Sequence, residues 1–128
     1  MKLVAVAPIS AVLLFPASAG AQSGYNTVPC NAAQGYKVLE FKPRQCTMGG
    51  KFGYQQAPVY SIRWRSWRGA TAFGRGTLRG NMGFKARVRV KLYRREHWEE
   101  NTYLFTRARG TTFMPDGSRR HWTLKLWS

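Results

Sequence analysis

One short segment of the chain brings an acid, a base and cations together. Residues 94–101 read RREHWEEN, so Arg95, Glu96 and His97 are consecutive. In a ribonuclease built on this combination, the glutamate takes the proton of the 2′-hydroxyl, the histidine protonates the leaving oxygen and the arginine stabilises the phosphorane. The segment also fits a polar, salt-bridged turn, and an exposed turn offers no cleft for a substrate. We therefore predict no catalytic residues, and keep a small secreted ribonuclease-like hydrolase as an alternative.

Three other groups of residues have types that bind ligands. His97 lies near three glutamates, but one histidine is a weak basis for a metal site, so we predict neither a metal nor another cofactor. Cys30 and Cys46 fit a disulfide, two free thiols or half of a metal site. Trp67, Trp98 and Trp127 would stack on sugar rings if they lay exposed in one plane, which keeps a carbohydrate-binding module as a second alternative.

Lysines and arginines recur at every second position in several segments. The clearest is 84–92, FKARVRVKL, where apolar residues and cations alternate strictly. A period of two is typical of a strand with one face in the core and the other in solvent. Extending this parity to the other segments predicts one basic binding face, made of Arg63, Arg75, Lys85, Arg87, Arg89, Lys91, Arg107, Arg109 and Lys125.

The elements that would position this face are strands. Alternation indicates strands at 60–64, 70–78, 84–92, 103–109 and 122–126, with a sixth at 36–41, and turn residues separate them. No segment has a helical period. We predict an all-β fold, a small antiparallel β-sandwich or barrel of about six strands in meander-like order, and we read residues 22–29 as a loose arm.

Small residues in 70–78 predict a packing arrangement. Gly74 and Gly76 share the parity of Ala70 and Ala72, which leaves room for Trp64 or Trp122 from a facing strand. We prefer this to a phosphate-binding glycine loop, because such a loop needs a helix after it. Trp64 falls on the apolar parity and is expected in the core, whereas Trp67 is expected at an exposed turn.

The first residues predict export. Lys2 precedes an apolar run over 3–15, and small residues around 17–21 fit a cleavage site after Ala21. The run is shorter than the roughly 20 residues of a membrane span. We predict a signal peptide at 1–21, a single domain at 22–128 and a secreted, extracellular protein without a transmembrane segment. In that compartment an even cysteine count favours a Cys30–Cys46 disulfide over the other two possibilities.

The charge balance indicates the kind of partner. The chain has 21 lysines and arginines against five acids, a formal charge of +16. So few acids cannot offset the cations by local pairing, and the excess costs self-repulsion. We predict non-catalytic binding to an anionic polymer or cell-surface component, namely nucleic acid, teichoic acid or anionic lipid. The alternative is that the cations form an ordinary solvated surface, and that arginine is frequent in it because the genome is GC-rich.

A motif in the same region carries a resemblance to a family. WRSWRGATAFGRGTLRGN is similar to the pattern W-x-x-W-G-x-x-x-A-x-G-x-G of small secreted actinobacterial proteins of unknown function. The matching positions are Trp64, Trp67, Gly69, Ala72, Gly74, Gly76 and Asn81. Arg68 interrupts the pattern, and a cysteine-bearing segment expected after Asn81 is absent. The resemblance implies an exported β domain and carries over no catalytic residues.

Overall fold

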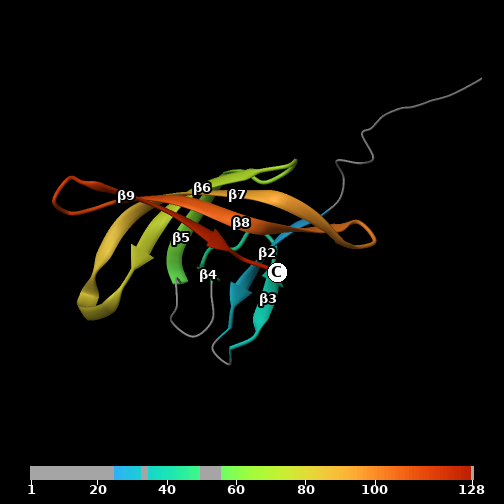
Figure 1. The fold of residues 1–128 in the computed structure, drawn as a ribbon, viewed down its shortest axis with the longest axis horizontal. Coiled ribbons are helices and arrows are strands. Elements are labelled where there is room, and N and C mark those ends of the chain that lie inside the picture. Colours follow the sequence, from blue (N-terminus) through green and yellow to red (C-terminus); the bar gives the residue numbers. More distant parts are fainter. Residues whose placement is uncertain (1–24, 33–34, 50–55, 128) are drawn as a thin grey trace, which may run out of the picture.

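The computed structural model describes residues 25–32, 35–49 and 56–127, so the predicted signal peptide at 1–21 lies outside the described residues. The described chain is all-β (Figure 1). Its strands are β2 (Tyr25–Asn31), β3 (Lys37–Glu40), β4 (Cys46–Gly49), β5 (Gln56–Ser66), β6 (Ala72–Arg79), β7 (Lys85–Glu99), β8 (Thr102–Phe113) and β9 (Arg119–Lys125). A short 3-10 turn, η2 (Asn81–Gly83), joins β6 to β7. No helix in this part of the chain is long and apolar enough to cross a membrane.

The eight strands form one mixed sheet. From β4 to β9 each strand pairs antiparallel with the next, which confirms the predicted order for the strands at 60–64, 70–78, 84–92, 103–109 and 122–126. The predicted strand at 36–41 is β3, which lies outside this meander. β2 departs from it, because it pairs parallel with the start of β8 and antiparallel with β3. Since β7 occupies the other edge of β8, β2 and β9 share one edge, β2 along 102–104 and β9 along 107–113. In Figure 1, β2, β3 and β4 lie to one side of the long strands β6–β8.

The architecture differs from the prediction in three ways. There are eight described strands rather than six, one pair is parallel, and the hydrogen-bonded sheet runs from β3 to β4 without closing, so it is neither a sandwich nor a closed barrel. The expected loose arm is wrong for the described residues 25–29, which belong to β2. Five consecutive residues of β2, from Asn26 to Cys30, are buried. A strand that is buried on both faces has no alternating pattern, and β2 was therefore not predicted from the sequence.

The core lies against one face of the long strands. Ala86, Val88, Val90 and Leu92 of β7 are buried, whereas Lys85, Arg87 and Arg89 are exposed, as the alternation predicts. Val28 of β2 and Met48 of β4 complete the cluster from the other side. The segment 103–109 follows the pattern less closely, because Phe105 is fully buried and packs edge-on against Trp67, with ring centroids 5.8 Å apart.

Two tryptophans fill the spaces that glycines leave. A Cβ built on Gly74 would lie 2.6 Å from the Trp64 ring, and one on Gly110 would lie 2.0 Å from the Trp122 ring. Both glycines are register partners of the tryptophan they face. The packing interpretation of Gly74 is therefore confirmed, with Trp64 half-buried at the margin of the core.

Trp67 is buried, so its predicted exposure is wrong. Only 5% of the residue is accessible, and its indole Nε1 donates a 2.8 Å hydrogen bond to the carbonyl oxygen of Asn26. The Asn26 amide donates in turn to the carbonyl oxygens of Trp67, at 2.7 Å, and Gly69, at 2.9 Å. This pairing holds the end of β5 against the start of β2.

A bulge in β5 places Tyr60 and Ile62 on opposite sides of the sheet, whereas strict alternation over 60–64 would place them on the same side. Ser61 has a positive φ of 54°, and the register with β6 shifts between Tyr60 and Arg63. Ile62 remains buried, but Tyr60 lies under the Arg79 guanidinium, whose Cζ is 4.4 Å from the ring centroid.

The predicted disulfide is present. Cys30 of β2 and Cys46 of β4 are bonded, with their Cα atoms 5.2 Å apart. Both cysteines are consumed by this bond, so the free-thiol and half-metal-site alternatives are excluded.

Candidate functional site

The nine predicted cations lie together on the solvent side of the sheet. Arg63, Arg75 and Arg89 are successive register partners across β5, β6 and β7. Lys91 is paired with Arg109, and Arg107 with Lys125. Residues directly opposite on antiparallel strands, and residues two apart on one strand, project from the same face. The cationic face is therefore Arg63, Arg75, Lys85, Arg87, Arg89, Lys91, Arg107, Arg109 and Lys125.

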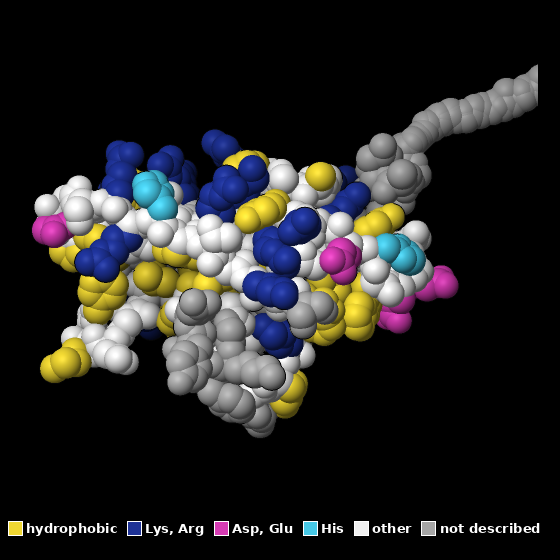
Figure 2. Space-filling model, viewed as in Figure 1, with side chains coloured by type: hydrophobic (Ala, Val, Ile, Leu, Met, Phe, Trp, Pro, Cys, Tyr) yellow, Lys and Arg dark blue, Asp and Glu magenta, His cyan; other side chains and the backbone are white. Residues whose placement is uncertain are grey.

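No residue of the cationic face has an acidic cross-strand partner. The partners are lysine, arginine, threonine, phenylalanine and tyrosine side chains. The described acids lie elsewhere, in β3, near the β7–β8 turn and in the β8–β9 turn. In the view of Figure 2, lysine and arginine side chains lie along the upper edge and in the centre of the molecule, and acidic ones lie at its left end and on its right side. Like charges directly opposite one another destabilise a sheet, so the fold keeps these cations close at a cost.

Aromatic rings lie between the cations. Lys91 is 5.7 Å from the Phe73 centroid and 5.8 Å from the Tyr93 centroid. Arg109 lies over Tyr93 at 5.3 Å, and Arg87 and Arg89 lie over Phe113 at 5.5 and 5.0 Å. The described residues place a cation within 6 Å of a ring centroid nine times. The rings occupy the places where acids would otherwise balance the charge.

The sequence reading missed these rings and three further cations. Phe73, Tyr93 and Phe113 continue the parity of the cations on β6, β7 and β8, and that parity was sufficient to find them. Arg65 lies 5.8 Å from the Phe73 centroid, Arg119 lies 5.2 Å from the Phe113 centroid, and Arg79 is the register partner of Lys85. Arg65 lies in a second register shift of β5, between Trp64 and Ser66, where simple alternation no longer identifies the face.

The nine cations of the face differ in their exposure to solvent. Seven of the nine are exposed, and Lys91 and Arg107 are half-buried. The Arg107 guanidinium donates hydrogen bonds to the carbonyl oxygens of Thr106, at 3.0 Å, and Trp127, at 3.5 Å. Arg107 therefore lies at the margin of the face and is partly engaged by the backbone.

An open hollow of about 580 Å³ lies within the cationic face. Strands β5, β6, β7 and β8 all contribute to it, and Phe73, 37% exposed, lines it. Its other lining side chains include Trp64, Arg63, Arg65, Arg75, Arg89, Lys91 and Arg109. A concave surface with two aromatic side chains and several cations suits a flat group attached to an anion.

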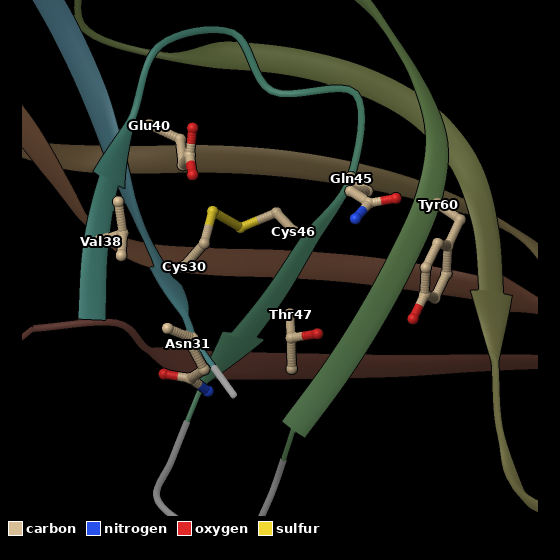
Figure 3. A pocket seen from close by; sticks show the side chains of 9 residues that line it. Cys30, Asn31, Val38, Glu40, Gln45, Cys46, Thr47 and Tyr60 are labelled. Atoms are coloured by element: carbon tan, nitrogen blue, oxygen red, sulfur yellow. A yellow bond between two sulfur atoms is a disulfide. The ribbon is translucent and has the colours of Figure 1, made fainter. Parts of the chain in front are cut away.

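A smaller hollow of about 170 Å³ lies beside the disulfide. Figure 3 shows the Cys30–Cys46 bond in its centre, with Glu40 of β3 on one side and Tyr60 of β5 on the other. Glu40 is the only carboxylate among its lining residues, and none of them is a lysine, arginine or histidine. It offers no pair of groups for acid–base chemistry.

The acid and base of residues 94–101 do not face a common site. β7 continues to Glu99, so most of the segment predicted as a turn is strand. Glu96 is paired with Leu104 and His97 with Tyr103, and consecutive strand residues point to opposite faces. The His97 Nε2 lies 2.6 Å from the carbonyl oxygen of Glu100, which engages the ring locally. Among the described residues, no group of three or more histidine, cysteine or acidic side chains could hold a metal.

The three tryptophans suggested for sugar stacking do not form a platform. Trp67 is buried, and the rings of Trp98 and Trp127 meet edge-on, with centroids 5.2 Å apart and planes at 85°.

Two described groups outside the cationic face have displaced pKa values. Burial lowers the pKa of Lys37, whose ammonium donates a 2.8 Å hydrogen bond to the carbonyl oxygen of Gly49. Hydrogen bonds from the Ser118 hydroxyl and backbone N–H lower the pKa of Asp116 in the β8–β9 turn. Neither interaction involves a residue of the cationic face.

No protein-family model matches the chain, and no match was found among curated proteins or solved structures. Function is therefore inferred from the geometry of the cationic face.

Proposed function

We propose that the protein binds an anionic polymer or surface through its cationic face without catalysing a reaction. The ligand classes that fit are nucleic acid, teichoic acid and anionic lipid headgroups, because each presents repeated negative charges. The proposed setting is outside the cell, where the Cys30–Cys46 disulfide would persist.

The supporting observation is the direct pairing of like charges across strands. Arg63, Arg75 and Arg89 follow one another across three strands, and Lys91 is paired with Arg109. A sheet selected only for stability and solubility would alternate the signs of its surface charges, since opposite-charge cross-strand pairs are favourable and like-charge pairs are not. The negative charges of a bound polyanion would attract these cations and so offset the repulsion between them.

A salt titration tests the proposal. Affinity for single-stranded DNA and for teichoic acid is measured against salt concentration, for the wild type and for the Arg87→Gln/Arg89→Gln double variant. Each neutralised phosphate releases counterions, so log affinity should fall linearly with log salt, with a slope of about −0.7 to −0.9 per contact. Losing two contacts should reduce the magnitude of that slope by about one to two.

A matched control separates this face from total charge. The Arg68→Gln/Arg120→Gln variant removes two exposed arginines whose positions lie outside the face, and its slope should stay near that of the wild type. The DNA and a parallel RNA sample should be recovered at full length, because the proposal includes no cleavage. Absence of binding at about 50 mM salt, or equal slopes in the wild type and the face variant, would contradict it.

A further inference from the structure

The rings on the cationic face separate the three candidate ligand classes. Phosphate groups alone need only cations, and the face already supplies nine. The exposed ring of Phe73 and the half-buried rings of Tyr93 and Phe113 lie on the solvent side of the sheet, outside the buried core cluster. Aromatic rings interleaved with cations are the combination that binds single-stranded nucleic acid, because bases stack on the rings while cations follow the phosphates.

We infer that the ligand is single-stranded nucleic acid whose unpaired bases stack on Phe73, Tyr93 and Phe113. This inference rests on the proposed polyanion binding and names its substrate class. Stacking tolerates any base, because every base has a π face, and phosphate contacts carry no sequence information. Binding should therefore be nearly independent of nucleotide sequence.

The best-defined stacking position is the hollow around Phe73. The ring is 37% exposed and lines the hollow beside Trp64, and Arg65 and Lys91 lie on its flanks at 5.8 and 5.7 Å from its centroid. The volume of the hollow, about 580 Å³, is within the range of about 300–1,000 Å³ that is usual for sites that hold small organic groups. A base on Phe73 would leave its neighbouring phosphates within reach of Arg75 and Lys91.

Tyr93 extends the surface from that hollow toward β8. Lys91 contacts both Phe73 and Tyr93, so the two rings flank one cation. They lie on neighbouring strands two positions out of register, since Phe73 is paired with Lys91. Diagonal neighbours of this kind are about 7–8 Å apart, which allows successive bases to reach successive rings once they are unstacked from each other.

Duplex DNA, teichoic acid and lipid headgroups cannot use the rings in this way. A duplex keeps its bases stacked on each other, and teichoic acid and lipid phosphates carry no bases. These ligands would bind by charge alone, with the salt dependence described above. A preference for unpaired bases is therefore the distinguishing property.

The test compares two strands that differ only in their bases. Oligothymidylate and an abasic strand of equal length, with the same phosphate backbone, are titrated at one fixed salt concentration. We expect oligothymidylate to bind tighter than the abasic strand, and Phe73→Leu and Tyr93→Leu each to weaken only the oligothymidylate complex. Stacking is worth about 1–3 kcal/mol per base, so each ring should contribute roughly five- to 150-fold in affinity.

The control variant is Tyr36→Leu, which removes an exposed ring that precedes β3, on the far side of β2 from the long strands. Its affinity for both strands should match that of the wild type, and thermal unfolding confirms that every variant is folded. If the two strands bind equally, or if duplex DNA, teichoic acid or anionic vesicles bind tighter than oligothymidylate, the stacking inference is wrong while polyanion binding stands. If none of these anions binds, both the stacking inference and the proposed polyanion binding are wrong.

Discussion

Gly74 and Gly110 each leave the space that a tryptophan ring occupies on the next strand. Gly74 faces Trp64 of β5, and Gly110 faces Trp122 of β9. Neither glycine is among those with a positive φ, so the requirement is steric rather than conformational. A methyl group at either position would have to displace an indole ring that packs against the core.

We predict that Gly110→Ala destabilises the protein by about 1–3 kcal/mol, the usual cost of overpacking a well-packed site. The added Cβ would lie 2.0 Å from Trp122, and moving that ring would also break the 2.9 Å hydrogen bond from its Nε1 to the Thr112 hydroxyl. Urea unfolding measures the effect. The neighbouring exposed Thr123→Ala should stay within about ±0.5 kcal/mol, and an equally small change for Gly110→Ala would show that Trp122 is free to move.

At this scale the sequence predicted the positions of residues that parity assigns to one face of a strand. All nine cations and the space beside Gly74 were found because alternation assigns each residue of a regular strand to a face. Asn26 and Trp67 were not found, since their reciprocal hydrogen bonds join residues 41 positions apart and leave no periodic signal. Alternation over 60–64 also fails to place Tyr60, because the bulge at Ser61 shifts the register by one residue.

Among the elements, strands with one solvent-exposed face were predicted, and strands that are buried on both faces were not. The alternation of β7 extends over most of its length, whereas β2 is buried on both sides and β4 has only four residues. The parallel pairing of β2 with β8 joins residues about 77 positions apart, and no local pattern specifies it. The six predicted strands correspond to β3 and to β5–β9, and only β5–β9 form the predicted meander, because β3 pairs with β2.

The link between β2 and β4 leads to a prediction at the scale of elements. We expect the Cys30→Ala/Cys46→Ala double variant to lose about 3 kcal/mol of unfolding free energy, because the bond closes a loop with a sequence separation of 16. Urea unfolding with and without reductant measures it. The reductant should lower the midpoint of the wild type and leave the variant unchanged; an effect on neither protein would mean that β2 and β4 are held by packing alone.

For the whole molecule, charge opposes folding. A chain of formal charge +16, with arginines facing arginines across the sheet, should be least stable where charges are least screened. We predict that the thermal midpoint rises as salt increases from about 10 mM to about 150 mM, over which the Debye length falls from about 30 to about 8 Å. Differential scanning fluorimetry across this range measures the trend.

Two variants of equal charge identify the source of that repulsion. Arg63→Gln/Arg75→Gln removes a directly opposed pair and should raise the midpoint at low salt and flatten its salt dependence. Arg68→Gln/Arg120→Gln removes the same charge from positions without a cationic register partner and should do so less. Identical behaviour of the two would assign the effect to net charge rather than to pairing on the cationic face.

The disulfide gives the open sheet a closed path. Hydrogen bonds connect β2 through β8, β7, β6 and β5 to β4, and the Cys30–Cys46 bond joins β4 back to β2. One covalent bond thus completes a ring of strands that backbone pairing leaves incomplete. Reduction would free β2 and β4 to separate, and unpaired strand edges are templates for strands of other chains. The same bond that steadies one molecule would therefore also limit edge-to-edge aggregation between molecules.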